Sequence, residues 1–155
     1  MKVAIAGKGG VGKTTIAATL ARLLGRAGLS VLAIDADPAM NLAAALGISP
    51  AFGKTIVPIS DNPNLIEERT GARPGETSGA VFNLTPRVED LASKFGVPAS
   101  DNTRLLVLGT VKSAGSGCMC PANALLRALL HHLLLRKGEA VVMDMEAGLE
   151  HLGRG

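Results

Sequence analysis

Short apolar runs alternate with longer segments of helical periodicity along this chain. Four apolar runs predict strands buried on both faces, as in a parallel sheet: residues 2–6, 31–37, 105–110 and 140–146. The segment 14–25 predicts an amphipathic helix that ends at Gly25 or Gly28. Residues 121–137 predict a second long helix, which begins at Pro121 and ends at Arg136-Lys137-Gly138.

Three shorter helices are expected between the second and third strands. The first covers about 39–47, and the last covers about 88–95 and ends at Gly96. Between them, Asp61-Asn62-Pro63 predicts a capped helix start and Gly71 its end. Otherwise, the pattern of hydrophobic and polar residues predicts secondary structure least clearly in the stretch 48–104.

This alternation of strands and helices predicts an α/β fold with a mostly parallel, doubly wound sheet. We expect residues 1–155 to form a single domain. Four strands are few for such a sheet, and no closing helix follows the fourth. The sequence is therefore interpreted as the N-terminal fragment of a longer domain whose C-terminal part is missing.

Composition and charge narrow the classes of function. The chain has 47% hydrophobic residues, three Phe, no Trp and no Tyr, which argues against a base-stacking platform for single-stranded nucleic acid. The net charge of +3 is mild and the basic residues are scattered, so we expect no nucleic-acid partner and no membrane partner. No leader and no apolar span are recognised, and two cysteines fit a reducing cytoplasm.

A phosphate-binding loop follows the first predicted strand. Gly7, Gly12, Lys13 and Thr14 fit the pattern GxxxxGK[ST], with a strand before it and a helix after it. Backbone N–H groups of such a loop surround a phosphate, the lysine reaches the β and γ phosphates, and the Thr14 hydroxyl binds Mg²⁺. The residues assigned to nucleotide binding in this loop are Gly7, Lys8, Gly9, Gly10, Val11, Gly12, Lys13, Thr14 and Thr15.

Acidic residues follow two of the predicted strands. Ligands of open α/β sheets lie beyond the carboxyl ends of the strands, which is where Asp35, Asp37 and Asp144 fall. Asp144 ends an apolar strand like a Walker B aspartate that holds Mg²⁺, and the Gly148 N–H could meet the γ-phosphate. The alternatives are helix caps for Asp35 and Asp37 and an ordinary strand-end acid for Asp144.

Cys118-Met119-Cys120 lies in a Gly-rich loop before the last predicted helix. A helix N-terminus favours thiolates, which bind soft or borderline metals such as Ni²⁺ and Zn²⁺. One chain offers only two sulfurs, and His131 and His132 lie about three turns along the helix. A two-fold homodimer would complete a Cys₄ site. The alternative is a pair of inert, buried small residues.

The segment after this cysteine pair is apolar on nearly all sides. Its leucines are Leu125, Leu126, Leu129, Leu130, Leu133, Leu134 and Leu135. Such a helix is buried, either in the core of the chain or partly in a dimer contact.

The stretch GKGGVGKT resembles the deviant Walker A signature of the ATPases that include ParA, MinD, the nitrogenase iron protein and the arsenite-pump ATPase. The resemblance implies that Lys8 crosses a dimer interface to the partner's nucleotide, so that hydrolysis depends on dimerisation. It also implies that Asp37 orients the attacking water and that Asp35 binds Mg²⁺ through water. The implied catalytic residues are Lys8, Lys13 and Asp37.

The combination GKGGVGKTT, DADP, CMCP and DMEAGLEHLGRG is similar to the CooC-type ATPases that insert nickel into carbon monoxide dehydrogenase or mature acetyl-CoA synthase. This resemblance implies a cytoplasmic homodimer that binds and hydrolyses ATP, with Mg²⁺, and delivers Ni²⁺ to a nickel enzyme. It makes Cys118 and Cys120 the ligands of Ni²⁺ or Zn²⁺. Known members run about 100 residues further, so ATP rather than GTP is implied by resemblance alone.

Three other functions remain open at this point. A ParA- or MinD-type positioning ATPase would act on DNA or membrane, an iron-protein-like electron carrier would need two well-separated cysteines, and a fragment would bind nucleotide poorly. The sequence does not identify the metal, the client enzyme or the trigger for dimerisation. It also leaves open whether the chain folds and is active alone.

Overall fold

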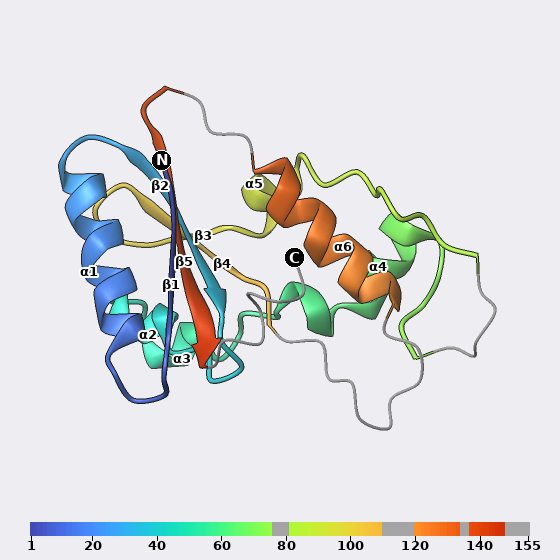
Figure 1. Cartoon of the computed structure of the whole chain (residues 1–155), viewed down its shortest axis with the longest axis horizontal. Coiled ribbons are helices and arrows are strands. Elements are labelled where there is room, and N and C mark those ends of the chain that lie inside the picture. Colours follow the sequence, from blue (N-terminus) through green and yellow to red (C-terminus); the bar gives the residue numbers. More distant parts are fainter. Residues whose placement is uncertain (76–80, 110–119, 134–136, 148–155) are drawn as a thin grey trace. The chain divides into compact units, whose positions relative to one another are not determined.

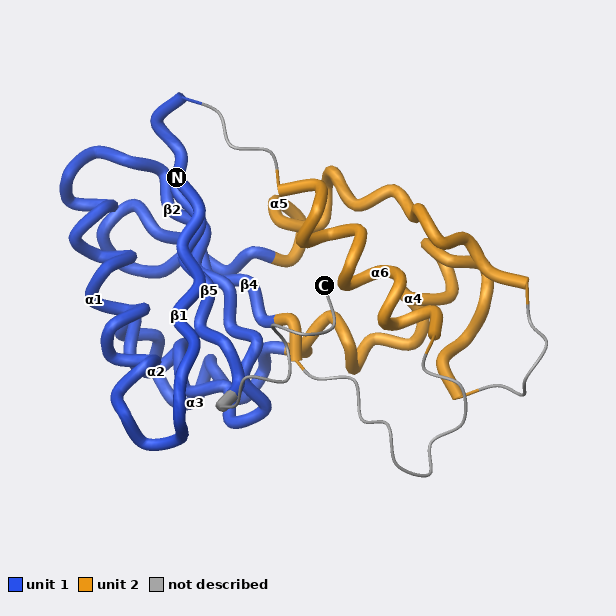
Figure 2. The backbone as a smooth tube through the Cα atoms, in the orientation of Figure 1, with its two compact units in different colours: residues 1–56, 96–107, 135–155 blue, residues 57–95, 108–134 orange. Residues whose placement is uncertain are grey.

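The computed structural model describes residues 1–75, 81–109, 120–133 and 137–147 (Figure 1). Two compact units are present (Figure 2). The first comprises residues 1–56, 96–107 and 135–155, and the second comprises residues 57–95 and 108–134. The expectation of a single ATPase domain over 1–155 stays a prediction.

The first unit is an α/β sheet of mostly parallel strands, as predicted. Its strands are β1 (Lys2–Gly7), β2 (Ser30–Ala36), β3 (Val97–Pro98), β4 (Thr103–Val107) and β5 (Glu139–Ala147). Their order in the sheet is β1-β5-β2-β4-β3, and only β3 runs antiparallel to its neighbour. All four predicted strands are therefore present, and the two-residue edge strand β3 is an addition that the sequence did not reveal.

Helix α1 (Lys13–Arg26) lies beside the sheet (Figure 1), and most of its buried residues have small side chains. Ala17, Ala18, Ala21 and Gly25 are buried, and α1 packs against β1, β2, β4 and β5. At Gly25 the fit is tightest, because a Cβ there would overlap the carbonyl oxygen of Asp101. The position of α1, and of the loop that precedes it, is thus fixed by close packing.

The remaining helices of the first unit are short. Helix α2 (Leu42–Ala45) lies inside the helix expected at 39–47. Residues 39–41 are not helical, and so that prediction was too long. Helix α3 (Pro50–Gly53) starts with the Ser49 hydroxyl as its cap, accepting from the Phe52 N–H. Leu42 and Leu46 contribute large, fully buried side chains to the core beside α1.

The second unit is helical. It contains the 3₁₀ helix η1 (Ile59–Asp61) and the helices α4 (Pro63–Thr70), α5 (Leu91–Phe95) and α6 (Cys120–His132). The predicted caps of α4 are confirmed: the Asn62 side chain accepts from the Leu65 N–H, and Gly71 ends the helix at φ 82°. The helix expected at 88–95 is present as the shorter α5.

Helix α6 ends earlier than predicted. It stops at His132, and Lys137-Gly138 form a turn rather than the last turn of a helix. Leu125 and Leu129 are buried as expected, whereas Leu126 and Leu130 are only half-buried. Leu134 and Leu135 lie outside the described residues, so the prediction that they are buried stays a prediction. Within the described part of the chain, no helix is long and apolar enough to cross a membrane.

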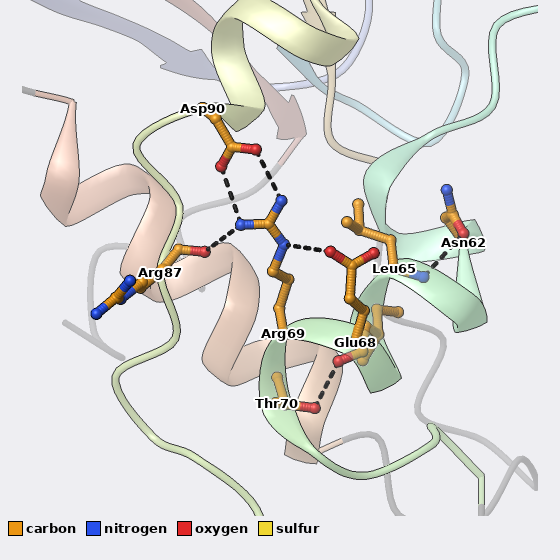
Figure 3. A network of polar contacts seen from close by, with 8 residues as sticks. Asn62, Leu65, Glu68, Arg69, Thr70, Arg87 and Asp90 are labelled. Atoms are coloured by element: carbon orange, nitrogen blue, oxygen red, sulfur yellow. Dashed lines mark hydrogen bonds and ion pairs between the residues drawn. The ribbon is translucent and has the colours of Figure 1, made fainter.

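Arg69 joins α4 to the segment that leads into α5 (Figure 3). Its guanidinium binds both carboxylate oxygens of Asp90, at 2.9 and 2.7 Å, and the Arg87 carbonyl at 3.2 Å. Its Nε lies 3.3 Å from Glu68 Oε1 in an ion pair. The hydrogen bond to Arg69 holds the pKa of Asp90 below its usual value.

We expect Arg69→Met to lower the thermal denaturation midpoint by a few degrees, because a bidentate pair between the mostly buried Arg69 and the half-exposed Asp90 is lost. The pKa of Asp90 is lowered from 3.8, so this stabilisation is present above pH 3.8 and disappears as the pH falls further. The difference between wild type and variant should shrink accordingly in acid. Arg73→Met is the matched control, since Arg73 and Glu67 form an exposed pair. Equal shifts for both variants would contradict the prediction.

Candidate nucleotide-binding site

The glycine-rich loop connects β1 to α1 at the carboxyl end of β1. Gly10 has φ 77° and Gly12 has φ 89°, in the left-handed region that other residues rarely adopt. A Cβ at either position would meet no atom within 4 Å. The glycines are therefore needed for the backbone path, which curls around open space at the N-terminus of α1.

The two lysines of the loop have different surroundings. Lys13, the first residue of α1, is only 7% exposed, and its Nζ lies 3.4 Å from the Lys8 carbonyl oxygen. The Lys8 side chain is on an exposed residue of the loop. The Lys13 side chain thus folds over the glycine-rich loop, at the place where a phosphate would bind. Lys8 is exposed to solvent and accessible to another molecule.

Two carboxylates lie opposite each other at the carboxyl ends of β2 and β5. The strand register pairs Asp35 with Asp144, and Ile5 of β1 pairs with Asp144 on its other side. Both aspartates are 0% exposed. The sheet therefore brings together two acids that are more than a hundred residues apart in the chain, beside the strand that leads into the glycine-rich loop.

Asp144 is the unsatisfied member of this pair. Neither of its carboxylate oxygens completes a hydrogen bond with any described residue, although both oxygens are buried. Burial raises the pKa of Asp144, and the Asp37 charge adds to this, while the nearby Thr14 hydroxyl and Lys13 charge oppose it. A buried carboxylate without partners beside a threonine hydroxyl matches the oxygen ligands that Mg²⁺ requires.

Asp35 is satisfied by the backbone instead. Its Oδ1 accepts from the Asp37 N–H at 3.1 Å, and its Oδ2 accepts from the Leu42 N–H at 3.0 Å. Burial raises the pKa of Asp35 to about 6 despite these two bonds, and the charges of Asp144 and Asp37 contribute. Burial therefore opposes the ionised form of Asp35 more strongly than its two hydrogen bonds favour it.

Asp37 lies just beyond β2 in the turn that leads to α2. Its Oδ1 accepts from the Ala39 N–H at 2.8 Å, and its carbonyl accepts from the Met40 N–H at 3.0 Å. These bonds form a tight turn rather than a helix start, since α2 begins only at Leu42. Asp37 is half-buried, and its charge influences both Asp35 and Asp144.

The predicted metal-binding cysteines are only partly described. Cys120 is the exposed first residue of α6, whereas Cys118 and Gly148 lie outside the described residues, so their assignments stay predictions. No group of three or more His, Cys, Asp or Glu that could hold a metal occurs among the described residues. His132 faces Glu89, at 4.0 Å, in a groove of about 500 Å³ within the second unit.

The sequence prediction missed the unequal partnering of Asp35 and Asp144. Asp144 was predicted to bind Mg²⁺ from its place at the end of an apolar strand, and Asp35 was predicted to bind Mg²⁺ through water by resemblance. The signal that separates them is not local: Asp35 is followed by a turn whose N–H groups fold back onto it, and the strand that carries Asp144 has no such turn among its described residues.

Comparison with known proteins identifies the family. The domain described as the CobQ/CobB/MinD/ParA nucleotide binding domain matches residues 2–150. An uncharacterized ATP-binding protein of Methanocaldococcus jannaschii is 52% identical over 154 residues, which are 99% of this chain and 58% of that protein. The carbon monoxide dehydrogenase accessory protein CooC of Rhodospirillum rubrum is 52% identical over 155 residues, 100% of this chain and 58% of CooC.

The chain thus spans 58% of the length of these two relatives. A plasmid partition protein from Borrelia burgdorferi has a similar structure with a TM-score of 0.48 and 18% identity, over 95% of this chain and 55% of that one, a likeness too weak to argue from. The matched residues include the glycine-rich loop and all three strand-end acids. The chain belongs to the CobQ/CobB/MinD/ParA family of nucleotide-binding domains.

Proposed function

We propose that the chain is the nucleotide-binding part of an ATPase that loads nickel into carbon monoxide dehydrogenase or acetyl-CoA synthase. The observation that carries the ATPase part is the buried, unpartnered Asp144 carboxylate beside Thr14, next to the glycine-rich loop. The client part is supported by the 52% identity to the carbon monoxide dehydrogenase accessory protein CooC. The proposed setting is the cytoplasm.

In this proposal the loop N–H groups and Lys13 bind the phosphates of ATP, and Thr14 and Asp144 hold Mg²⁺. When bound, Mg²⁺ neutralises the charge that develops on the transferred phosphoryl group. Asp37 orients the attacking water, a role that is implied by resemblance and supported by its place at the same edge of the sheet as the other two acids. Asp35 is assigned to Mg²⁺ through water by resemblance alone.

Lys8 is proposed to act in trans. Its exposure on the loop leaves it accessible to a second copy of the chain, where its charge would stabilise the partner's nucleotide as an arginine finger does. The nickel ion is the cargo, held by Cys118 and Cys120 of both copies in a Cys₄ site. Dimerisation then serves hydrolysis and metal binding together.

The test combines metal stoichiometry with the oligomeric state. Reduced protein is titrated with Ni²⁺ or Zn²⁺ during light scattering, beside the variant Cys118→Ala/Cys120→Ala. One metal per two chains, with dimers formed only when both cysteines are present, is the expected result. Met119→Leu is the matched control, because it alters the residue between the two cysteines and keeps both thiols.

Equal binding by the cysteine variant, or no binding at all, would reject the nickel-delivery part of the proposal. Binding of ATP by the same chains, measured separately, would then favour the positioning function that the MinD and ParA members of the family suggest. No binding of ATP would reject both.

A further inference from the structure

Asp35 and Asp144 occupy equivalent places on neighbouring strands and yet have opposite surroundings. Both lie at the carboxyl end of the sheet, in register, and both are 0% exposed. Asp144 has two oxygens without hydrogen bonds among the described residues, whereas each oxygen of Asp35 already accepts a backbone N–H. A cation would therefore be bound more strongly by the Asp144 carboxylate than by the Asp35 carboxylate, whose oxygens already accept hydrogen bonds.

The two N–H groups that Asp35 binds are the two ends of one loop. The Asp37 N–H opens the turn after β2, and the Leu42 N–H opens α2. Leu42 is itself fully buried in the core beside α1, so this end of the loop is anchored to the packed interior. One carboxylate thus clamps both ends of residues 37–42.

Inside this loop, the Ala39 and Met40 N–H groups donate to the Asp37 carboxylate and carbonyl. Met40 adopts φ 49°, an unfavourable region for a side chain of that kind, and it is 42% exposed. Among the residues that the structure describes, the Ala39 N–H of the same turn is the one hydrogen-bond donor to the Asp37 carboxylate. The direction of Asp37 therefore depends on a turn that the Asp35 carboxylate closes.

We propose that Asp35 is a positioning residue, which clamps the loop 37–42 and thereby aims Asp37, instead of serving mainly as a ligand of Mg²⁺ through water. The inference rests on the proposed ATPase function for its catalytic consequence. The clamp itself rests only on the two hydrogen bonds of Asp35. It can therefore be tested without measuring ATP hydrolysis.

Asp35→Asn is the informative variant because asparagine has the same shape but only one accepting oxygen. Its amide nitrogen cannot accept, so one of the two N–H bonds is lost and one end of the loop is released. Misplacement of Asp37 is expected to lower kcat about 10- to 100-fold. The concentration of Mg²⁺ that gives half-maximal activity should stay within about twofold of wild type, whereas Asp144→Asn should raise it strongly.

A double-mutant cycle shows whether Asp35 acts through Asp37. If it does, the double variant Asp35→Asn/Asp37→Asn should have the same kcat as Asp37→Asn alone. Once the Asp37 carboxylate is removed, Asp35 has no carboxylate left to position. Asp61→Asn removes an exposed carboxylate elsewhere and should change neither quantity. Multiplicative losses in the double variant, or a raised Mg²⁺ requirement in Asp35→Asn, would overturn the inference.

Amide hydrogen exchange measured by NMR decides the clamp independently of catalysis. The Leu42 and Asp37 amides should both exchange slowly in the wild-type chain, and the one that loses its acceptor in Asp35→Asn should exchange clearly faster, with no change in Asp61→Asn. Equal exchange in wild type and Asp35→Asn would overturn the clamp. A wild-type chain that hydrolyses no ATP would reject the proposed function, and the exchange comparison would still decide this inference.

Discussion

Replacing Asp144 with asparagine is expected to reduce Mg²⁺-dependent ATP hydrolysis by at least about 100-fold, while making the nucleotide-free protein more stable. The loss of activity follows because the amide provides no negative charge for the cation beside Thr14. The gain in stability follows because a buried carboxylate without hydrogen bonds is removed. Hydrolysis and thermal denaturation, each measured with and without MgATP, check both parts.

The sign of the stability change follows from the pKa of Asp144. The folded state raises this pKa above 3.8, so the ionised form opposes folding once the pH exceeds 3.8. Asp144→Asn should therefore gain stability at neutral pH and gain little in acid. MgATP should stabilise wild type by mass action and leave the variant nearly unchanged. Asp61→Asn is the matched control, and a variant that MgATP stabilises as much as wild type would contradict the assignment.

The second large effect is on stability and concerns the contact between Gly25 of α1 and the Asp101 carbonyl, which we call the seam. We expect Gly25→Ala to lower the free energy of unfolding by about 3 kcal/mol, because the added methyl group overlaps the Asp101 carbonyl. The higher helix propensity of alanine offsets only about 1 kcal/mol of this loss in the free energy of unfolding. Arg22 and Arg26 bind the Asp101 carboxylate at 2.7 and 3.0 Å and keep that segment from moving aside.

Gly53→Ala provides the comparison for this prediction. Gly53 also lies in a helix, but its added Cβ would meet only the Ala43 Cβ at 3.9 Å, which is ordinary contact. Urea denaturation of both variants measures the difference. A Gly25→Ala variant as stable as Gly53→Ala would show that the seam can open.

Local patterns predicted much of this fold because the chemistry they encode is local. The glycine-rich loop needs particular residues at fixed spacing, and the four parallel strands are continuous apolar runs, so both were visible in the sequence. The caps of α4 were visible for the same reason, since Asn62 and Gly71 act on their own helix.

Features that depend on distant partners were not predictable in this way. Strand β3 is two residues long and contains Pro98, so that it owes its place to pairing with β4 rather than to its own composition. Helix α6 ends at His132 although leucines continue the apolar pattern beyond it. The different partners of Asp35 and Asp144 likewise arise only when the turn before α2 folds back.

The position of β1 in the sheet has a consequence for the order in which the molecule can assemble. β1 is an edge strand whose sole neighbour in the described sheet is β5, with Lys2 opposite Val141 and Ile5 opposite Asp144. On a ribosome, β1 emerges well over a hundred residues before β5, its partner in the described sheet. Closing so long a loop is slow compared with local helix formation. The loop after β1 should therefore acquire its final geometry only after β5 has emerged and paired with β1.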